Sequence, residues 1–289
     1  MQDSQTQTAR AAVWMIGAIL SFSAMAVAGR EASLSLDTFE IMMYRSCVGV
    51  VVVSAMITAL GRWTSVATAR LSQHGLRNAV HFAGQNLWFY AVSVLPLAQV
   101  FALEFTSPIW VILLAPVLLG EKLTRMRGLA VLLGFIGILI VARPSPATFN
   151  IGLACAAASA VFFALTSIAT KRLTRHETIW SIMFWLTALQ LLFGLIFAGW
   201  DLDIALPDAQ NLPLLLIIGC AGLSAHFCIT NALSLAPAAV VIPIDFARLP
   251  FIALLGWLIY NEPVEIWLFV GAALILAGNL INIVSSRQQ

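Results

Sequence analysis

The stretch VGVVVVSAMITAL, residues 48–60, carries no charged side chain, and LAVLLGFIGILIV, residues 129–141, is a second continuous apolar run. Strands of a membrane barrel alternate polar and apolar residues, and neither stretch does so. In lipid, the backbone amides of such a stretch are then satisfied only within a helix. These two stretches therefore predict membrane-spanning helices.

The composition of the whole chain agrees with a membrane protein. Hydrophobic residues make up 61% of the 289 residues and charged residues 10%, whereas a soluble domain is about a quarter charged because its surface stays in water. A water-soluble monomer is therefore excluded. The net charge of +2 is too small and too dispersed for nucleic-acid binding. The cysteines show no CxxC spacing, so we expect buried thiols and neither a metal nor a cofactor: Cys47, Cys155, Cys220 and Cys228.

The chain divides into ten predicted spans, each near the length of about 20 residues that a helix needs to cross the hydrocarbon. Pro96 and Pro237 mark two boundaries, because proline ends a helix at about the preceding residue. The first span resembles a signal peptide, but its basic flank carries only Arg10 and its apolar stretch is too long, so we expect a permanent span. The predicted spans are Ala11–Ala28, Phe39–Leu60, Leu76–Val94, Ala98–Leu119, Gly128–Ala142, Ile151–Thr170, Ile179–Trp200, Leu212–Ser234, Ala238–Tyr260 and Ile266–Val284.

The positions of lysine and arginine predict the orientation, because cytoplasmic loops are enriched in these residues. With the N-terminus inside, eleven basic residues fall in inside segments, and only Arg30 and Arg143 fall outside. The outside loops instead collect acidic residues. We therefore expect both termini to be cytoplasmic. The inside residues are Arg10, Arg62, Arg70, Arg77, Lys122, Arg125, Arg127, Lys171, Arg172, Arg175 and Arg287.

The two halves of the chain repeat at a constant offset of 141 residues. AVSVLP at residues 91–96 and ALSLAP at residues 232–237 share three of six residues. A fixed offset that holds across both halves without a gap predicts a first repeat at residues 1–145 and a second at residues 146–289. The same offset aligns Glu104 with Asp245, Phe105 with Phe246, Glu121 with Glu262 and Gly137 with Gly278.

Each half contains five spans, and an odd number makes the second half enter the membrane upside down relative to the first. The charges agree: three basic residues follow Glu121, and none follows Glu262 in the corresponding loop. Inverted repeats are typical of secondary transporters, in which exchange of the two conformations turns an inward-facing cavity outward. The fold class predicted is an all-α membrane protein of ten helices in two inverted five-helix repeats, working by alternating access.

The ends of the fourth and ninth predicted spans resemble the pattern of a known family. Leu118-Leu119-Gly120-Glu121 closes the fourth span and Ile259-Tyr260-Asn261-Glu262 closes the ninth, and both are similar to the EamA-domain pattern of the drug/metabolite transporter superfamily. The resemblance covers nearly the whole chain and is greatest to the YddG-type amino-acid exporters. It implies a ten-helix bundle in the bacterial cytoplasmic (inner) membrane, with a central cavity that moves small metabolites outward.

Four charged side chains lie within predicted spans, where each costs at least about 2.5 kcal/mol unless it is paired or faces water. Arg45 and Glu104 lie at similar depth on two spans, so a pair between them is geometrically allowed. Asp245 and Arg248 are three residues apart on one helix face and can pair locally. Two interpretations stay open: structural pairing, or a function in proton coupling or in binding the charged ends of a substrate.

Polar side chains form a stripe on the third span, and such a stripe faces a cavity or a neighbouring helix rather than lipid. The fourth span adds a second polar face, and aromatic residues on other spans can supply the walls of a cavity. These residues predict a site for the two ends of a zwitterion and an apolar side chain. The predicted cavity residues are Tyr44, Asn78, His81, Gln85, Trp88, Gln99, Thr106, Trp110, Phe163 and Trp185.

Prolines inside the fourth and ninth spans each remove a backbone donor and allow a kink or a broken helix near the middle of the membrane, which suits hinges of a rocking mechanism or static curvature. They are Pro108, Pro116, Pro243 and Pro250.

Other classes of function fit the sequence less well. Ser224 and His226 stand two apart on a helix and point in different directions, so they form no catalytic pair, and we expect no enzyme. A channel would show a ring of like residues. We therefore expect an exporter of small amphipathic metabolites, amino acids with aromatic side chains among them. A multidrug carrier, a nucleotide-sugar-type carrier and a channel are the alternatives.

Overall fold

The computed structural model describes residues 2–119, 124–143, 150–200, 202–235, 241 and 244–286. Over these residues the chain is helical and has no strand, as the apolar runs predict. The helices are α1 (Gln2–Ala32), α2 (Thr38–Ala59), the short 3-10 helix η1 (Trp63–Val66), α3 (Leu71–Val94), α4 (Leu97–Glu104), α5 (Ser107–Leu119), α6 (Arg125–Ala142), α7 (Ile151–Leu173), α8 (Ile179–Ala198), α9 (Asn211–Leu235), α11 (Arg248–Tyr260) and α12 (Ile266–Ser286).

Eight helical segments of the described chain are long and apolar enough to cross a membrane, so the protein is an integral membrane protein. The predicted third span is not among them, although α3 has 24 residues, because α3 carries the polar stripe. The ninth is not among them either, because α11 has only 13 residues. The count of ten spans therefore stays a prediction.

The predicted fourth span, Ala98–Leu119, is represented among the eight by Leu97–Leu114, and it is broken inside, since α4 ends at Glu104 and α5 begins at Ser107. The chain turns at Phe105 and Thr106, where the Thr106 amide donates to Leu103 O at 3.0 Å instead of continuing the α-helical ladder. The predicted ninth span differs similarly, because α11 begins only at Arg248, after a turn at residues 246–247.

The prolines correct a second expectation. Pro108 and Pro250 lie in the first turns of α5 and α11. Backbone amides in a first turn have no acceptor within the helix, so a proline there removes no helical hydrogen bond. Of the predicted hinge prolines that the structure describes, only Pro116 lies in the interior of a helix. Pro243, Pro237 and Glu121 lie outside the described residues. Of the two predicted alternatives, a kink or a broken helix, the described chain has breaks, at residues 105–106 and 246–247.

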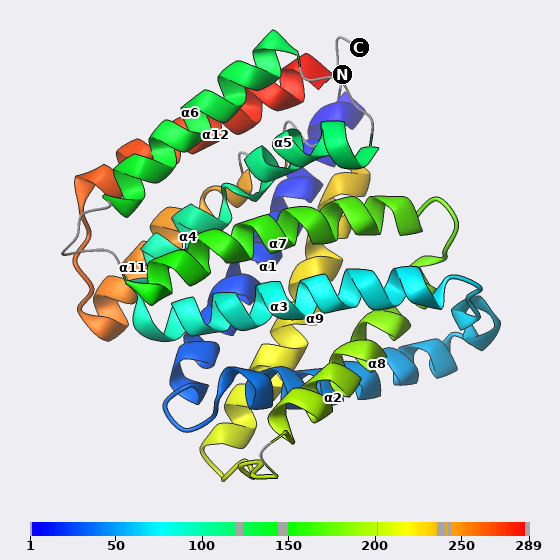
Figure 1. Ribbon diagram of the computed structural model, residues 1–289. Coiled ribbons are helices and arrows are strands. Elements are labelled where there is room, and N and C mark those ends of the chain that lie inside the picture. Colours follow the sequence, from blue (N-terminus) through cyan, green and yellow to red (C-terminus); the bar gives the residue numbers. More distant parts are fainter. Residues whose placement is uncertain are drawn as a thin grey trace.

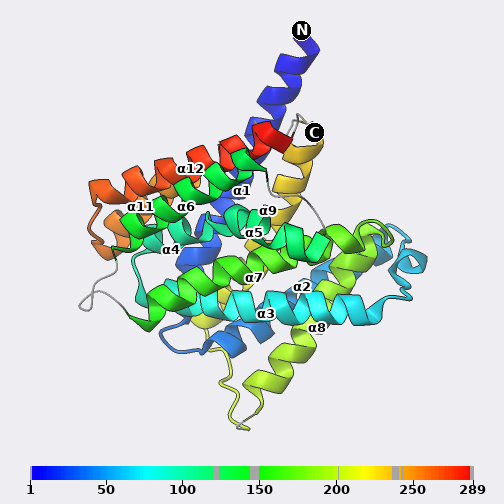
Figure 2. The same ribbon diagram turned by 45° about the horizontal axis from the view of Figure 1, so that its top comes forward.

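The helices pack in long pairs that join distant parts of the sequence. α1 lies along α9, α3 along α7, α2 along α8 and α6 along α12, and Figures 1 and 2 show the last pair side by side in both views. Each pair joins a helix before residue 143 to one after residue 150. The two halves of the chain are thus interleaved across one bundle.

The α6–α12 pair makes its closest approach at glycines. A Cβ at Gly137 would lie 2.6 Å from Gly271 O, and one at Gly278 would lie 2.6 Å from Ala130 O. Backbone meets backbone at both places, and only a residue without a side chain fits. Small residues of this kind let membrane helices approach closely enough for dispersion contacts to hold them.

Polar contacts fasten one end of the bundle, which we call the acidic end and which comprises residues 33–37, 199–210 and 261–265. Arg30 forms an ion pair with Glu262, and its other nitrogens donate to Val92 O at 2.7 Å and to Leu95 O. Glu262 also accepts from the Leu97 amide at 2.9 Å. The end of α1, the α3–α4 connection and the end of α11 are therefore tied together there.

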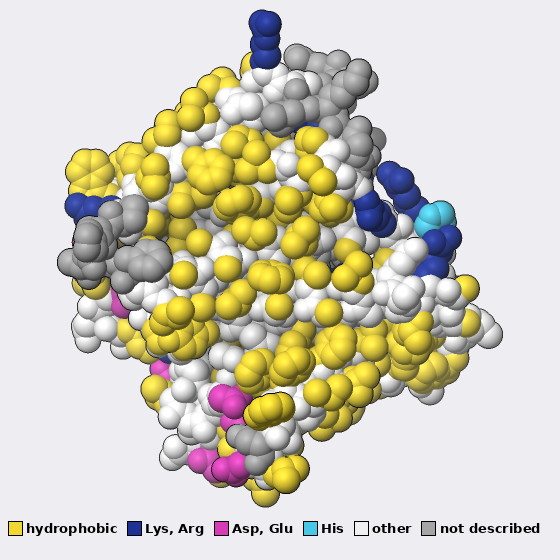
Figure 3. Space-filling model, viewed as in Figure 1, with side chains coloured by type: hydrophobic (Ala, Val, Ile, Leu, Met, Phe, Trp, Pro, Cys, Tyr) yellow, Lys and Arg dark blue, Asp and Glu magenta, His cyan; other side chains and the backbone are white. Residues whose placement is uncertain are grey.

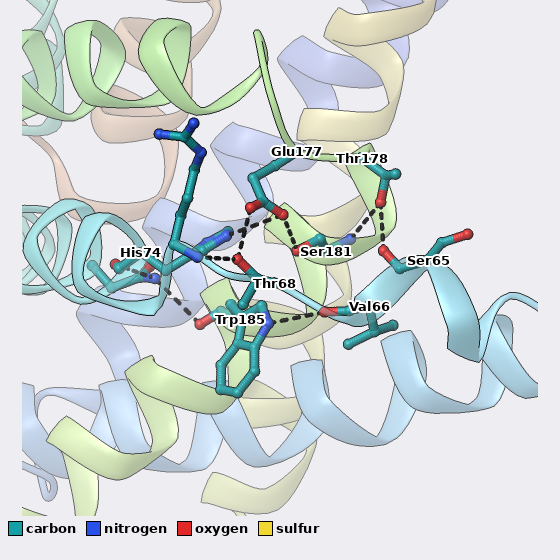
Figure 4. A network of polar contacts seen from close by, with 10 residues as sticks. Ser65, Val66, Thr68, His74, Glu177, Thr178, Ser181 and Trp185 are labelled. Carbon is teal, nitrogen blue, oxygen red and sulfur yellow. Dashed lines mark hydrogen bonds and ion pairs between the residues drawn. The ribbon is translucent and has the colours of Figure 1, made fainter.

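A second network fastens the opposite, basic end, which comprises residues 60–70 and 174–178 (Figure 4). Glu177 accepts hydrogen bonds from the hydroxyls of Thr68 at 2.7 Å and Ser181 at 2.8 Å, and its carboxylate lies 3.7 Å from His74 Nε2. Thr178 adds a bond to Ser65 O at 2.6 Å. The loop around η1 is thus held against the start of α8.

The surface agrees with a lipid environment. Figure 3 shows hydrophobic side chains over most of one face, with most of the visible Lys and Arg at the right edge, others at the top and left edges, and acidic side chains at the bottom and lower left. Large exposed apolar side chains occur on many helices, among them Val117, at 83% exposure, and Leu76, at 68%. Such a band is expected where hydrocarbon, and not water, surrounds the helices.

We predict that Gly137→Ala lowers the thermal stability of the detergent-purified protein, because the new methyl group meets Gly271 O and the two helices must separate. Overpacking of this kind typically costs about 1–3 kcal/mol. Gly128→Ala in the same helix is the control, since nothing lies within 4 Å of a Cβ there. Equal unfolding temperatures for the two variants would contradict the close contact.

We also predict a pH dependence for the basic-end network. Burial by itself raises the pKa of Glu177, but the hydrogen bonds from Thr68 and Ser181 and the neighbouring His74 outweigh it, so the pKa lies below its ordinary value of 4.5. A lowered folded-state pKa contributes stability above the unfolded pKa, and this contribution is lost as pH falls through the folded value.

Glu177→Gln should therefore have a lower unfolding temperature at neutral pH than the parent protein, and a shallower decline as the pH falls below the ordinary pKa of 4.5. Thermal unfolding at a series of pH values measures both. Thr68→Val, which removes one donor to the carboxylate, should change the profile in the same direction. Parallel profiles for all three proteins would refute a stabilising role of the carboxylate.

Candidate functional site

The two helix breaks face each other in the middle of the bundle. Phe105 lies in the turn between α4 and α5, and Phe246 lies in the turn before α11. Their rings stack with centroids 4.4 Å apart and an interplanar angle of 17°. The two residues also correspond at the offset of 141. Broken helices that meet in this way are typical of substrate sites in transporters, since backbone groups freed at a break need a polar surrounding.

A cluster of charges surrounds the breaks. Arg248 Nη2 lies 3.2 Å from Asp245 and 3.3 Å from Glu104, and the second oxygen of Glu104 accepts from Trp88 Nε1 at 2.8 Å. The Arg248 guanidinium also lies 4.5 Å above the ring of Phe22. The predicted local pair of Asp245 and Arg248 is therefore present.

The allowed pair of Arg45 with Glu104 is not formed. Glu104 takes Arg248 as its partner, while Arg45 Nη1 donates to Gln85 Oε1 at 2.6 Å. Similar depth in the membrane does not bring two side chains together unless their helices are neighbours. α2 packs against α3, α8 and α9, and α4 packs against α3, α6, α7, α11 and α12.

A cavity of about 40 Å³ lies among α2, α3, α8 and α9. A cavity of this size holds a few water molecules at most. Its polar lining comes from every one of the four helices, and glycines supply the remaining space. The lining residues are Met42, Arg45, Ser46, Gly49, His81, Met183, Leu186, Thr187, Gln190, Gly219, Gly222, Leu223 and His226.

Positions that correspond at the offset of 141 meet across this cavity. In three pairs a polar side chain corresponds to a glycine or a leucine. The glycines leave room for side chains of other helices: a Cβ at Gly222 would lie 2.9 Å from Arg45 Nη2. The corresponding lining pairs are Met42 with Met183, Arg45 with Leu186, Ser46 with Thr187, Gly49 with Gln190, and His81 with Gly222.

Two buried side chains of the lining each have one polar atom without a hydrogen-bond partner among the described residues. His81 is 6% exposed and its Nδ1 is unpaired, and Gln190 is 3% exposed with Oε1 unpaired. His226, on the opposite side, is exposed although it lies in the middle of α9, and its ring packs edge to face on Phe22 at 5.7 Å. Unpaired polar atoms around a cavity need water or a ligand.

Phe22 connects the cavity to the charge cluster, because the same ring contacts His226 and lies under Arg248. His226, Gln190 and the three lining glycines were missed as cavity residues by the sequence analysis. Applying the repeat offset to the polar stripe finds His226, which corresponds to Gln85. Nothing in the local sequence of α8 distinguishes Gln190 from an ordinary buried glutamine.

The structure separates the other predicted cavity residues. His81 lines the cavity, Gln85 holds Arg45, and Phe163 packs on His81 at 6.2 Å. Asn78 instead donates to Trp185 O at 3.2 Å. It also accepts Gln190 Nε2 at its own carbonyl at 2.8 Å, so it joins α3 to α8.

The remaining members of the set lie elsewhere. Tyr44 donates to Ala205 O at 2.8 Å at the acidic end, and Trp185 donates to Val66 O at 3.1 Å in the basic-end network (Figure 4). Thr106 closes the turn after α4 through Leu103 O. Trp110 packs edge to face on Phe135, and Gln99 lines a separate hollow of about 660 Å³ at the acidic end.

Curated proteins similar to this chain are described as transporters. The riboflavin transporter of Vibrio cholerae is 31% identical, with 92% of this chain and 90% of that protein covered. The S-adenosylmethionine uptake transporter of Rickettsia bellii is 25% identical, with 95% of this chain and 94% of that protein covered. The pseudopaline exporter CntI of Pseudomonas aeruginosa is 29% identical and covers 93% and 91%.

The fold and the sequence family agree with these relatives. A solved crystal structure that is 19% identical aligns over 96% of this chain and 98% of its own length, with a TM-score of 0.66, which shows the shared fold. The sequence model of the EamA-like transporter family matches twice, over residues 9–143 and 150–284. The two matches cover nearly the whole chain and start 141 residues apart. This membrane protein therefore belongs to the EamA-like transporter family.

Proposed function

We propose that the chain is an alternating-access carrier built from two inverted five-helix repeats, residues 1–145 and 146–289, with ten crossings in all. It lies in the bacterial inner membrane with both termini in the cytoplasm. The double match to the family at an offset of 141 supports the duplication. The separation of basic and acidic side chains in Figure 3 supports the orientation.

The helix contacts support the relation between the repeats. At the offset of 141, α1 corresponds to α7, α3 to α9 and α5 to α11. The packing of α1 on α9 thus has its counterpart in α7 on α3, and that of α5 on α7 in α11 on α1. The glycine contacts between α6 and α12 repeat likewise, since Gly137 corresponds to Gly278 and Ala130 to Gly271.

The observation that carries the proposal is the cavity at which corresponding residues of the two halves meet. Substrate sites of inverted-repeat transporters lie at the interface of the repeats near the middle of the membrane. Arg45, His81, Gln190 and His226 offer donors and acceptors there, and Met42 with other apolar residues completes the wall. A small amphipathic metabolite fits this mixture, and we propose export of amino acids, aromatic ones included.

The relatives favour a second class of substrate. Riboflavin and S-adenosylmethionine are named for transporters that this chain resembles over at least nine tenths of its length. Uptake of a larger heterocyclic metabolite is therefore the alternative. Either substrate is larger than the cavity of about 40 Å³, so binding needs the helices around it to open. A binding site that has to widen before it can hold its substrate agrees with a carrier whose helices move during transport.

We predict saturable counterflow in proteoliposomes that are tested with a panel of labelled compounds. The panel contains tryptophan, phenylalanine, riboflavin and S-adenosylmethionine. His226→Ala should lower counterflow of the transported compound by about fivefold or more, the loss of one hydrogen bond in the site. His176→Ala, in the exposed α7–α8 connection, is the matched control. Ohmic single-channel current in place of saturable exchange would refute the carrier proposal.

We propose, second, that the charge cluster couples transport to protons. Glu104 and Asp245 share one nitrogen of Arg248, and Asp245 Oδ1 has no hydrogen-bond partner among the described residues. The cluster thus contains two acids for one arginine, and intramembrane acids of transporters are often proton carriers. Structural pairing of the same groups is the competing interpretation.

Asp245→Asn should abolish the dependence of transport on a pH gradient while leaving counterflow of substrate intact, because it removes the second acid but keeps the hydrogen-bonding shape. Glu104→Gln should instead lower the unfolding temperature, because Trp88 and Arg248 both bind that carboxylate. Transport with and without an imposed pH gradient tests the first expectation. An unchanged response of Asp245→Asn would leave these acids a structural role.

A further inference from the structure

Arg45 differs from the arginines that have carboxylate partners in the described structure. Arg30 pairs with Glu262, and Arg248 lies between Asp245 and Glu104. No carboxylate of the described chain lies within ion-pair distance of Arg45. The guanidinium contacts a neutral amide, Gln85 Oε1 at 2.6 Å, and the sulfur of Met42 at 3.6 Å.

Arg45 lines the cavity, and part of its guanidinium is unpaired. Only Nη1 donates a hydrogen bond within the described chain, so Nε and Nη2 have no acceptor there. Both nitrogens lie beside Gly222, where a Cβ would be 2.9 Å from Nη2 and 3.3 Å from Nε. Any side chain at position 222 would therefore displace the guanidinium from its place in the cavity wall.

An unpaired guanidinium at this depth is costly. A charge in the middle of a membrane costs at least about 2.5 kcal/mol on the mildest scale and is retained where it pairs or serves a function. Nε and Nη2 lie on one edge of the planar guanidinium and match the two oxygens of a carboxylate or a phosphate. The missing partner of Arg45 is thus an oxyanion that the chain does not itself supply.

We infer that Arg45 binds an anionic group of the transported molecule, so that the substrate carries a carboxylate or a phosphate. This inference rests on the proposed carrier function and adds a requirement on its substrate. Gln85 holds the guanidinium by its carbonyl oxygen, while its amide nitrogen makes no bond among the described residues and can donate to the same anion. His226 lines the opposite wall and adds a further polar group.

The site binds one anionic group and not two. The residue that corresponds to Arg45 at the offset of 141 is Leu186, which lines the same cavity but carries no charge. The other polar side chains of the lining, among them His81 and Gln190, include no second arginine and no lysine. A substrate therefore places its anion at α2 and its uncharged or cationic part toward α8.

Matched pairs of probes test the requirement. Tryptophan is compared with tryptamine, which lacks the carboxylate, and riboflavin 5′-phosphate is compared with neutral riboflavin. The first pair tests carboxylate as the source of the anion and the second tests phosphate. Binding is measured as thermal stabilisation of the purified full-length protein, and transport as counterflow in proteoliposomes.

In the parent protein, one anionic probe should bind at least about tenfold more tightly than its uncharged or decarboxylated counterpart, as expected for a charge-assisted bidentate contact. Arg45→Gln should reduce that ratio to about one, and Arg45→Lys, which keeps the charge but loses the planar fork, should give an intermediate ratio. Gly222→Val should lower the ratio with Arg45 intact. Arg175→Gln, an arginine in the exposed α7–α8 connection, should leave it unchanged.

Two results would overturn the inference: equal binding within both pairs in the parent protein, or a preference for the anion that persists in Arg45→Gln. Absence of stabilisation by either anionic probe would count against it as well. The carrier proposal fails separately, if no probe shows saturable counterflow while anion-dependent stabilisation is still present. Neutral riboflavin carried equally well by the parent protein and by Arg45→Gln would keep the carrier and reject the anion requirement.

Discussion

The absence of water from the hydrocarbon layer is the constraint on which the rest of this structure depends. Backbone groups have no solvent partner there, so the described chain is helical throughout its apolar segments. Polar side chains are subject to the same constraint and turn toward one another. The polarity of α3, which makes it the least lipid-like of the long helices, places its buried polar residues inside the bundle, where α7 and α8 cover them.

The helices are held by a close backbone contact between α6 and α12 and by polar side-chain contacts at the two ends of the bundle. Along α6 and α12 the backbones touch at glycines, and separating them would expose carbonyl groups that no side chain can reach. At the two ends, side chains such as Arg30 and Glu177 hold the connections instead. These polar contacts exchange with water at modest cost, since a hydrogen bond contributes about 1 kcal/mol net. The seam between α6 and α12 is thus closed by backbone contact, and the two ends are closed by side-chain contacts.

Asymmetry between the halves gives the centre its chemistry. A perfect repeat would place two arginines or two leucines across the axis, and like charges at this distance in low dielectric would repel strongly. Here Arg45 corresponds to Leu186 and His81 corresponds to Gly222, and all four residues line the cavity. The missing side chain at Gly222 leaves room for the Arg45 guanidinium. Both halves of the chain thus line the cavity, and their different residues make its two sides chemically unequal.

The sequence by itself determined the helical membrane class, most helix positions to within a few residues, the offset of 141 and the four intramembrane charges, because hydropathy and charge are local properties of the chain. Only the tertiary structure decided which charges meet, that Arg45 lacks an acid partner, and that the fourth span breaks at Phe105. It also separated Tyr44, Asn78 and Trp185 from the cavity and brought His226 and Gln190 to it. These outcomes depend on which helices are neighbours, and helix neighbours are chosen by packing between residues far apart in sequence, a property that no local pattern contains.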